Sequence, residues 1–432
     1  MNLTNDQESG VNMFASFLLD PNEPLMLITG GAGTGKSTLV QYLTEKIDEL
    51  GKIASLVRST KIRPFIQITA TTNKAVNSLK LVCPKHEIRT IYSVLNLKPK
   101  GDGKGGLKFN REWGTDPVTL PENTVLVIDE VSYIDNNLSG ELLDMIKKSN
   151  CKVLLIGSKN QLTVGVPVMF DVATPYKVHL KETVRQKKKG TLANPITALS
   201  EAYERAVNGG PLPTIRPAHN IKVITDDAAF QKELASVDWS LISSCMVNKV
   251  LCYTNDRVKQ YNEYIQSTLG LAPGLHTSMV YTLGGLATNE NGKGKLVSDS
   301  TVVLDDIRLG STIEHYDVTF YRVVINGQNY LVPQDPEHLA STLKHLITAK
   351  NWKPFYHLQE IATDIRPYFA STVHKSQGST LSKVFIDLED IGRCYDLVTF
   401  ARMMHVAISR ATTEVVFYGE LPDKYKGTPI FS

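Results

Sequence analysis

The feature that most constrains this chain is a glycine-rich loop set between an apolar strand and a helix. Residues 30–37 read Gly-Gly-Ala-Gly-Thr-Gly-Lys-Ser, which fits the pattern GxxxxGK[ST], and they follow the apolar run Leu25–Thr29. A helical run, Thr38–Leu50, comes next, and we expect it to end at Gly51 as a helix C-cap. Glycines let a backbone wrap closely around phosphates while its N–H groups point inward, and the helix amino terminus adds partial positive charge. The loop therefore predicts an ATP site in an α/β domain.

The positions of this loop have distinct predicted roles. Lys36 is expected to reach the β and γ phosphates, and Ser37 to be a ligand of Mg²⁺. The other loop residues expected to hold ATP are Gly30, Gly31, Ala32, Gly33, Thr34, Gly35 and Thr38.

A pair of acids closes another apolar strand, Val125–Asp129. We expect Asp129 to hold the metal through water and Glu130 to polarise the attacking water as a general base. Two acids at a strand end are by themselves more often a solvated turn. The phosphate loop upstream favours the catalytic interpretation.

The segment Thr4-Asn5-Asp6-Gln7 precedes a helix near the amino terminus. Gln7 fits two roles. It can close a capping box with Thr4, or its amide can recognise the adenine ring of ATP. The sequence leaves both open.

Short apolar strands alternate with helices through the first 190 residues, which is typical of a parallel sheet covered on both faces. We expect those strands at Leu25–Thr29, Ile66–Ala70, Val125–Asp129 and Lys152–Gly157. The glycine- and lysine-rich segment Leu97–Leu120 interrupts the alternation and is predicted to be an inserted hairpin.

A second α/β unit follows a glycine- and proline-rich loop at Asn208–Pro217. Its strands are expected at Val250–Thr254, Val384–Leu388 and Glu414–Tyr418. A β-rich segment interrupts it, with strands expected at Ser300–Leu304, Val318–Val324 and Tyr330–Val332. Within that segment Asn326-Gly327 predicts a hairpin turn.

Composition limits the partners. The 432 residues carry 47 Lys and Arg against 44 Asp and Glu, so a nucleic-acid site must be a local patch. Five scattered cysteines without CxxC spacing argue against structural zinc and against a secreted disulfide framework. The apolar runs are too short to span a bilayer. We expect a cytoplasmic protein with no membrane partner.

An ordered set of motifs resembles superfamily 1 helicases of the RecD type, including phage members, over nearly the whole chain. The segments that carry the likeness are Ala70–Ala75 (motif Ia), Thr90–Leu95 (Ib), Asp129-Glu130 (II), Gly157–Leu162 (III), Leu180–Gln186 (IV), Tyr253–Asn255, Thr372–Gly378 (V) and Val406–Ala411 (VI). The sequence departs from the family at Ser158, where motif III has Asp, and at Thr71, where motif Ia has Pro.

The resemblance implies roles at the nucleotide. Gln161 would contact the γ-phosphate or the attacking water, and Arg185 and Arg410 would approach the transferring phosphoryl group from opposite sides. Gln377 and Gly378 of motif V would also contact ATP. As isolated residues these arginines would more often be surface ion-pair partners.

The resemblance also implies a path for a single strand of nucleic acid. Its residues would be Thr72, Asn73, Ser93, Asn255, Thr372 and His374, whose side chains suit phosphate contacts without base readout. His374 could instead be a satisfied buried histidine. Phe109 and Trp113, beside several lysines, suit stacking on a parting base pair, although Leu97–Leu120 could also be an ordinary solvated loop.

Together these expectations describe an ATP- and Mg²⁺-dependent DNA helicase that moves on single-stranded DNA, in replication, recombination or repair. The resemblance to the family implies that it moves 5′ to 3′. The fold class is α/β, with two RecA-like P-loop domains, a hairpin insertion and a β-rich, SH3-like insertion. We expect domain 1A at 1–96 and 121–190, 1B at 97–120, 2A at 191–269 and 355–432, and 2B at 270–354.

The expected partners are single-stranded DNA, duplex junctions, and single-strand-binding or replication proteins, with the chain itself a monomer. A phage-encoded chain would act in the host cytoplasm. Two alternatives remain open: an ATP-switched nucleic-acid-binding or remodelling protein that does not unwind processively, and an RNA-directed motor of the same fold.

Overall fold

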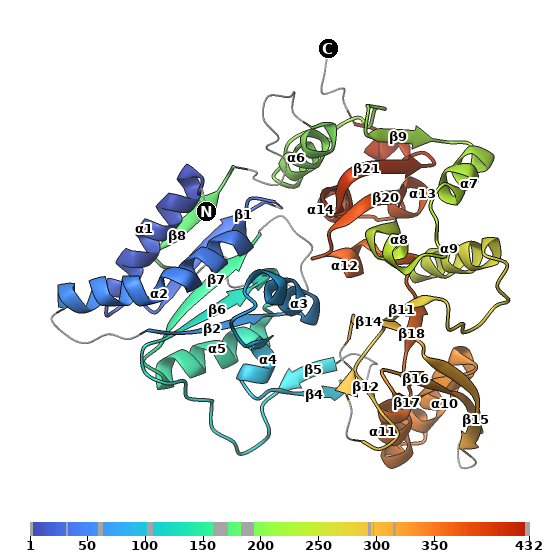
Figure 1. Ribbon diagram of the computed structural model, residues 1–432, viewed down its shortest axis with the longest axis horizontal. Coiled ribbons are helices and arrows are strands. Elements are labelled where there is room, and N and C mark those ends of the chain that lie inside the picture. Colours follow the sequence, from blue (N-terminus) through green and yellow to red (C-terminus); the bar gives the residue numbers. More distant parts are fainter. Residues whose placement is uncertain are drawn as a thin grey trace. The chain divides into compact units, whose positions relative to one another are not determined.

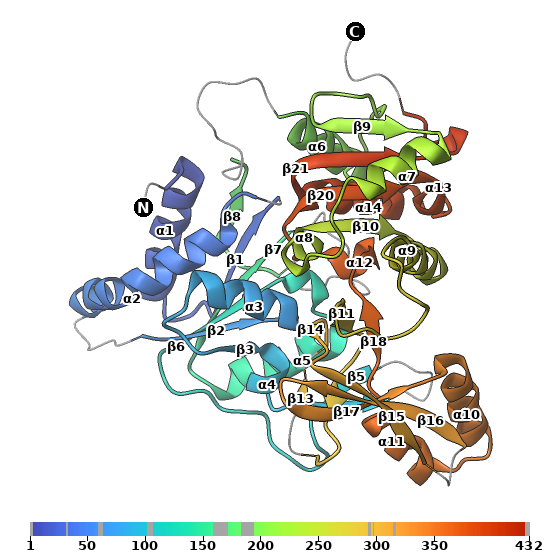
Figure 2. The same ribbon diagram turned by 45° about the vertical axis from the view of Figure 1, so that its right-hand side comes forward.

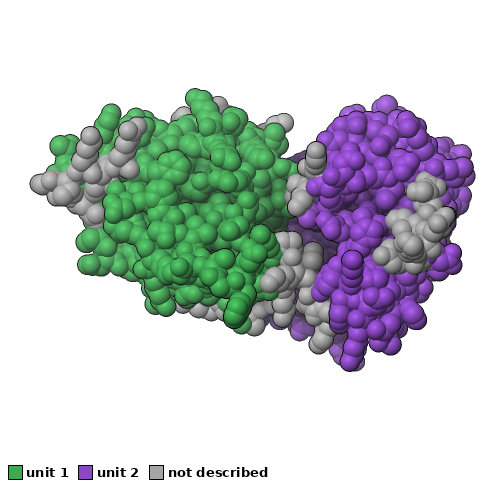
Figure 3. All heavy atoms as spheres, turned by 90° about the horizontal axis from the view of Figure 1, so that it is seen from below, with its two compact units in different colours: residues 1–194 green, residues 195–432 purple. Residues whose placement is uncertain are grey.

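The computed structural model describes residues 3–31, 33–58, 64–101, 107–158, 172–182, 194–292, 295–296, 298–313 and 317–427. The chain divides into two compact units, unit 1 at Met1–Asn194 and unit 2 at Pro195–Ser432 (Figure 3).

Unit 1 contains, within the described residues, a six-stranded sheet with the order β3-β2-β6-β7-β1-β8, and all its pairings are parallel. The strands are β1 (Leu25–Gly30), β2 (Phe65–Ala70), β3 (Ile88–Thr90), β6 (Thr124–Asp129), β7 (Lys152–Gly157) and β8 (Lys177–Leu180). Its helices are α1 (Asn5–Leu19), α2 (Lys36–Arg58), α3 (Asn73–Val82), α4 (Ile91–Val94), η1 (Val131–Tyr133) and α5 (Asn136–Lys148). The four strands expected in this region are confirmed.

Side chains on β1 alternate between two hydrophobic clusters, as buried parallel strands require. Ile28 packs with Phe14 of α1 and Leu39 of α2 in one cluster. Its neighbour Leu27 packs in the other cluster, with Leu142 of α5. The sheet is thus covered on both faces, by α1, α2 and α3 on one side and by α5 on the other (Figures 1 and 2).

The prediction that the first long helix ends at Gly51 is wrong. Helix α2 continues to Arg58. Gly51 is buried, and it lies between Ile47 and Ala54, which are 7% and 1% exposed. These positions share one helix face, so burial of that face continues the helix through a residue that costs about 1 kcal/mol relative to Ala in a helix.

Unit 2 contains a five-stranded parallel sheet with the order β19-β10-β20-β21-β9. Its strands are β9 (Ile221–Ile224), β10 (Asn248–Cys252), β19 (Ala370–Thr372), β20 (Leu381–Asp387) and β21 (Ala411–Tyr418). The helices around it are α6 (Pro195–Val207), α7 (Asp227–Ala235), α8 (Ile242–Val247), α9 (Asn255–Thr268), α12 (Val373–Ser376), α13 (Leu388–Ile391) and α14 (Leu397–Arg410), and η3 (Asp423–Tyr425) follows. The second α/β unit predicted from the sequence is therefore present.

Antiparallel pieces interrupt both units. In unit 1 the hairpin of β4 (Lys98–Gly101) and β5 (Leu107–Asn110) lies inside the expected insertion. In unit 2 the added elements are β11 (Val280–Leu283), β12 (Ala287–Thr288), β13 (Lys295–Leu296), β14 (Thr301–Val303), β15 (Asp306–Ile313), β16 (Val318–Ile325), β17 (Gln328–Pro333), β18 (Ile365–Pro367), α10 (Pro336–Thr348) and α11 (Trp352–Ile361).

The turn predicted at Asn326-Gly327 joins β16 to β17 and is confirmed. Both residues have positive φ, 51° and 72°, as a two-residue hairpin turn with matching twist requires. The strands of this segment form three small antiparallel sheets, and the SH3-like barrel stays a prediction. Among the helices that the structure describes, none is long and apolar enough to cross a membrane.

Candidate ATP site and nucleic-acid path

The glycine-rich loop joins the end of β1 to the start of α2. Gly33 and Gly35 have φ of 81° and 79°, a left-handed conformation that favours glycine. A Cβ atom on Gly30 would lie 2.6 Å from Thr34 Oγ1 and 2.9 Å from the Leu180 carbonyl oxygen. These glycines therefore let the loop curl tightly at the helix amino terminus, the shape that a phosphate requires.

Lys36 folds back over this loop. Its Nζ donates to the carbonyl oxygens of Gly30 at 2.9 Å and Gly31 at 2.8 Å. Ser37 and Thr38 follow in the first turn of α2 and are half-buried. The structure thus brings the predicted phosphate and metal residues into one short stretch, while Ala32 lies outside the described residues.

Gln7 is buried against the same loop. Its Nε2 donates to the Thr34 and Gly35 carbonyl oxygens, at 3.3 Å each. Its Oε1 accepts from Thr4 N at 3.0 Å, and Thr4 Oγ1 accepts from Gln7 N, so the capping box is confirmed. The contact with the phosphate loop puts Gln7 at the nucleotide site, and adenine recognition stays a prediction.

The acid pair lies at the end of β6. Asp129 is buried, and its Oδ1 accepts from Glu130 N at 2.8 Å. Burial and the nearby Glu130 carboxylate raise the pKa of Asp129 to about 7, and the positive charge of Lys36 opposes this rise. A divalent cation would favour the ionised form, because it supplies the positive charge that the buried pair lacks.

Glu130 shows two signs of a functional residue. Its φ is 58°, a left-handed conformation that a side chain other than glycine adopts at a cost of about 1–3 kcal/mol. Its Oε2 is buried and has no hydrogen-bond partner among the described residues. A buried carboxylate oxygen without a donor is available to accept a proton from water.

Two residues of unit 1 that were not predicted hold the backbone of predicted site segments. Thr71 Oγ1 donates to the Glu130 carbonyl oxygen at 2.9 Å, and Thr71 N donates to the Asp129 carbonyl oxygen at 3.2 Å. Thr71 is the residue that stands where motif Ia has Pro, and Pro could make neither bond. The departure from the family pattern at Thr71 was therefore the sequence signal that could have identified this contact.

Asp6 is the other such residue. Its Oδ2 accepts from Lys181 N at 2.8 Å and from Glu182 N at 3.1 Å, just after β8. The next residues, 183–193, include Arg185 and lie outside the described chain, as does Gln161. Helix α1 therefore holds both the phosphate loop, through Gln7, and the segment that leads toward Arg185.

Unit 2 contains a buried arginine, Arg410, which was predicted to approach the transferring phosphoryl group. Arg410 is 4% exposed, and its guanidinium donates to Val406 O at 3.0 Å, Ser379 O at 3.3 Å and Ser409 Oγ at 2.9 Å. Ser379 follows the predicted ATP contacts Gln377, which is buried, and Gly378, whose φ is 78°. The structure therefore places Arg410 beside the motif V loop.

Threonines cap the helices that start where parallel strands end. Each Oγ1 accepts from a backbone N–H three residues on, and such a hydroxyl keeps its proton for a second bond. The four are Thr72 (α3), Thr90 (α4), Thr254 (α9) and Thr372 (α12). Two of these caps, Thr72 and Thr372, are among the residues predicted to contact single-stranded nucleic acid.

The other residues predicted to contact single-stranded nucleic acid lie close to these caps in the sequence. Asn73 is half-buried at the start of α3, and Ser93 is exposed in α4. In unit 2, Asn255 and His374 are exposed. His374 is therefore not a buried core histidine.

The two aromatic residues of the insertion differ in their surroundings. Phe109 packs on Tyr92, with ring centroids 4.2 Å apart, and its carbonyl oxygen accepts from Asn137 Nδ2 at 2.7 Å. Trp113 is 97% exposed. Phe109 thus anchors the hairpin to unit 1, and of the pair only Trp113 offers an open ring face.

Comparison with known proteins agrees with this site. Residues 18–167 match the AAA domain family, and residues 367–418 match the UvrD-like helicase C-terminal domain. The ATP-dependent DNA helicase dda of Enterobacteria phage T4 is 23% identical over 469 aligned positions, which cover 96% of this chain and 99% of that protein.

Two further similarities extend over most of the chain. The RecBCD enzyme subunit RecD of Mycobacterium tuberculosis (strain H37Rv) is 23% identical, over 92% of this chain and 67% of its own length. The Pif1 helicase of Candida albicans has a TM-score of 0.49 at 16% identity, covering 98% of this chain and 96% of its own.

Proposed function

The chain is an ATP-dependent DNA helicase of superfamily 1, of the RecD and Dda type, and we propose that it moves along single-stranded DNA from 5′ to 3′ and unwinds duplex DNA. The likeness to the phage T4 helicase along the whole chain supports the proposal. We place this activity in replication, recombination or repair, with a monomeric chain in the cytoplasm, or in the host cytoplasm for a phage-encoded chain.

The observation that carries the catalytic part is the open carboxylate oxygen of Glu130 beside Asp129 and Lys36. Lys36 neutralises phosphate charge, and Glu130 Oε2 takes a proton from the attacking water. Ser37 and Asp129 are the residues that would hold Mg²⁺, which neutralises phosphate charge when it is bound. Gln161, Arg185 and Arg410 orient the water and stabilise the charge that develops on the phosphoryl oxygens.

The path for single-stranded DNA in our proposal uses hydroxyl, amide and imidazole groups that follow the ends of β-strands in both units, namely Thr72, Asn73, Ser93, Asn255, Thr372 and His374. Hydrolysis makes the two units alternate their grip on the strand. Trp113 stacks on the parting base pair, because its ring is 97% exposed, while the packed ring of Phe109 supports the hairpin. Duplex junctions are the substrate of this activity, and single-strand-binding or replication proteins are the protein partners that we propose.

Strand displacement tests the proposal. DNA and RNA duplexes with a single 5′ or 3′ tail are mixed with enzyme, ATP and Mg²⁺, and the released strand is measured. We expect release from 5′-tailed DNA, and none with Lys36→Ala. Release only from 3′-tailed DNA would reverse the direction, release from RNA alone would favour an RNA motor, and ATP turnover with no release would favour an ATP-switched binding protein.

The same assay tests the wedge. Trp113→Ala should lower strand release about tenfold, since stacking on a base contributes about 1–3 kcal/mol, and should spare ATP turnover stimulated by single-stranded DNA. Tyr395→Ala, which removes a 94% exposed ring from unit 2, is the control. Equal loss of release and turnover in Trp113→Ala would mean that Trp113 supports the fold instead.

A further inference from the structure

A single buried carboxylate holds the turn that joins β10 to α9. Asp390 is 2% exposed, and its Oδ2 accepts from Tyr253 N at 2.7 Å and Thr254 N at 2.8 Å. Its Oδ1 accepts from Thr254 Oγ1 at 2.8 Å. Hydrogen bonds to an ionised acceptor are roughly twice as strong as neutral ones, so this turn is held firmly in one conformation.

Asp390 is itself held by a second buried acid. Its N–H donates to Asp387 Oδ1 at 2.9 Å, and Asp387 is 0% exposed. Asp387 Oδ2 accepts from Arg257 Nε at 2.6 Å and from the Tyr261 hydroxyl at 2.7 Å. The two acids therefore tie the end of β20 to the side of α9 and to the turn that precedes it.

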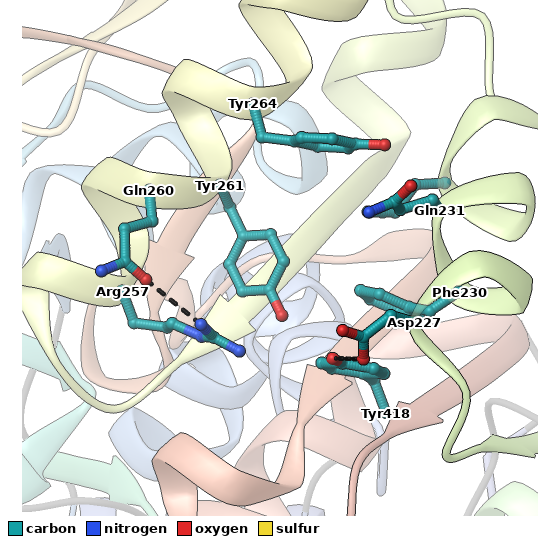
Figure 4. Close-up of a pocket in the computed structure, with 9 residues that line it drawn as sticks. Asp227, Phe230, Gln231, Arg257, Gln260, Tyr261, Tyr264 and Tyr418 are labelled. Atoms are coloured by element: carbon teal, nitrogen blue, oxygen red, sulfur yellow. Dashed lines mark hydrogen bonds between the residues drawn. The ribbon is translucent and has the colours of Figure 1, made fainter.

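The α9 side of this network is visible in Figure 4. Arg257, Gln260 and Tyr261 project from the helix, and Arg257 Nη1 donates to Gln260 Oε1 at 3.2 Å. Arg257 and Tyr261 also line the pocket drawn there, which has a volume of about 180 Å³. Arg257 therefore uses its donors on partners inside unit 2, which fixes the helix that follows the turn.

The network lies close to the surface. Asp390 and Thr254 line a second pocket of about 160 Å³, together with Asp256, Arg257 and Arg393. The next residue along the chain, Asn255, is exposed. A buried acid thus fixes the backbone immediately before a side chain that faces solvent.

We propose that Asp390 is a positioning residue that orients the Tyr253–Asn255 turn for single-stranded DNA. The inference rests on the proposed function, in which Asn255 contacts the strand. Both Asp390 oxygens accept bonds from the turn, so its part is to hold Asn255 in its binding orientation before the strand arrives. A turn ordered in advance loses less conformational entropy on binding. None of the residues predicted to hold ATP belongs to the network.

Asp390→Asn tests this role. We expect the Kd for a fluorescent single-stranded oligonucleotide, and the DNA concentration that half-saturates ATP turnover, to rise about tenfold, as loss of charge-assisted bonds predicts. Turnover at saturating DNA should stay within about twofold of the parent. A purely structural role would instead lower the amount of active enzyme and leave the half-saturating DNA concentration unchanged.

Asp335→Asn is the matched control. Asp335 also accepts two backbone N–H bonds, from Glu337 at 2.9 Å and His338 at 3.0 Å, but it caps α10. Its Kd for the oligonucleotide should not change. Should Asp390→Asn fail to fold, Thr254→Val takes its place, because it removes only the hydroxyl bond to Asp390 and the helix cap. It should raise the Kd for the oligonucleotide, and Thr254→Ser should restore the affinity.

The outcomes separate the two ideas. An unchanged Kd in folded Asp390→Asn overturns the positioning role alone. Parent protein that binds no single-stranded DNA overturns the proposed function, and the positioning role with it. A raised Kd with unchanged turnover at saturating DNA, absent in Asp335→Asn, supports the positioning role.

Discussion

In the parallel sheet of each unit, a pair of acidic residues lies at or shortly after the end of a buried central strand: Asp129 and Glu130 at β6 in unit 1, and Asp387 and Asp390 at β20 in unit 2. In unit 2 both acids are fully partnered: Asp387 accepts from Arg257 and Tyr261, and Asp390 accepts from the turn before α9. In unit 1 the Glu130 Oε2 atom has no partner among the described residues, and burial with a like charge raises the pKa of Asp129.

This comparison distinguishes an acid with a catalytic role from an acid with a structural role at equivalent places in a fold. A carboxylate whose lone pairs are satisfied by the protein stabilises one conformation. A buried carboxylate that is left open costs free energy, and it persists where a ligand or a reaction uses it. Substitutions of the acids in the two units should therefore differ in what they change, catalysis in unit 1 and conformational stability in unit 2.

Arg410→Ala should lower DNA-stimulated ATP turnover by about 10³ or more, the size of effect seen when an arginine finger is lost. The contrast assigns the water-activating acid to unit 1, so unit 2 should act on ATP chiefly through this cation. Turnover is measured with and without single-stranded DNA. Arg308→Ala, an arginine whose side chain is 65% exposed, is the control, and undiminished stimulation in Arg410→Ala would show that unit 2 is not needed for the reaction.

Glu130→Gln should lower turnover by about 10²–10⁴, because an amide cannot take a proton from water. ATP binding should persist, since Lys36, Ser37 and Asp129 remain. Single-turnover hydrolysis and nucleotide affinity are measured together, with Glu122→Gln on the surface of unit 1 as the control. Parental turnover would mean that an open carboxylate oxygen here has no catalytic use.

Asp387→Asn should lower the free energy of unfolding by about 3 kcal/mol, because it weakens a buried ion pair and leaves the Arg257 charge inadequately paired. Urea denaturation monitored by fluorescence gives this value. The control is Asp306→Asn, whose exposed pairing with Arg308 should contribute less than about 1 kcal/mol. If both variants lose the same small free energy of unfolding, the partnered acids of unit 2 do not have the stabilising role assigned to them.

Glu130→Gln should raise the free energy of unfolding by roughly 1 kcal/mol at pH 8 without nucleotide or Mg²⁺, because it removes a like charge beside Asp129. The same urea denaturation gives this smaller value. A loss of stability similar to that of Asp387→Asn would mean that the two acid pairs serve the same purpose.

Much of the fold could be predicted because its signals are local. Within the described residues, apolar runs located four of the six strands of the unit 1 sheet and three of the five strands of the unit 2 sheet, and Asn326-Gly327 located a hairpin, since each signal depends on residues adjacent in sequence. The end of α2 could not be placed, because burial of Gly51 depends on tertiary packing and overrides its low helix propensity.

The site divides in the same way. The phosphate loop and the acid pair are short motifs, so the sequence located them. Asp390 could not be found, because its partner Thr254 lies 136 residues away and no local pattern links them. The contact of Gln7 with the phosphate loop also joins residues that are distant in sequence, and only the capping box with Thr4 was local.

The lysine folded over the glycine loop has a thermodynamic consequence. Because Lys36 Nζ already donates to Gly30 and Gly31, phosphates that recruit it must displace two main-chain acceptors. Nucleotide capture is therefore an exchange of partners, in which Lys36 Nζ leaves two carbonyl oxygens for phosphate oxygens. The loss of these two bonds offsets part of the free energy gained with the phosphates, so the exchange lowers the net affinity for nucleotide.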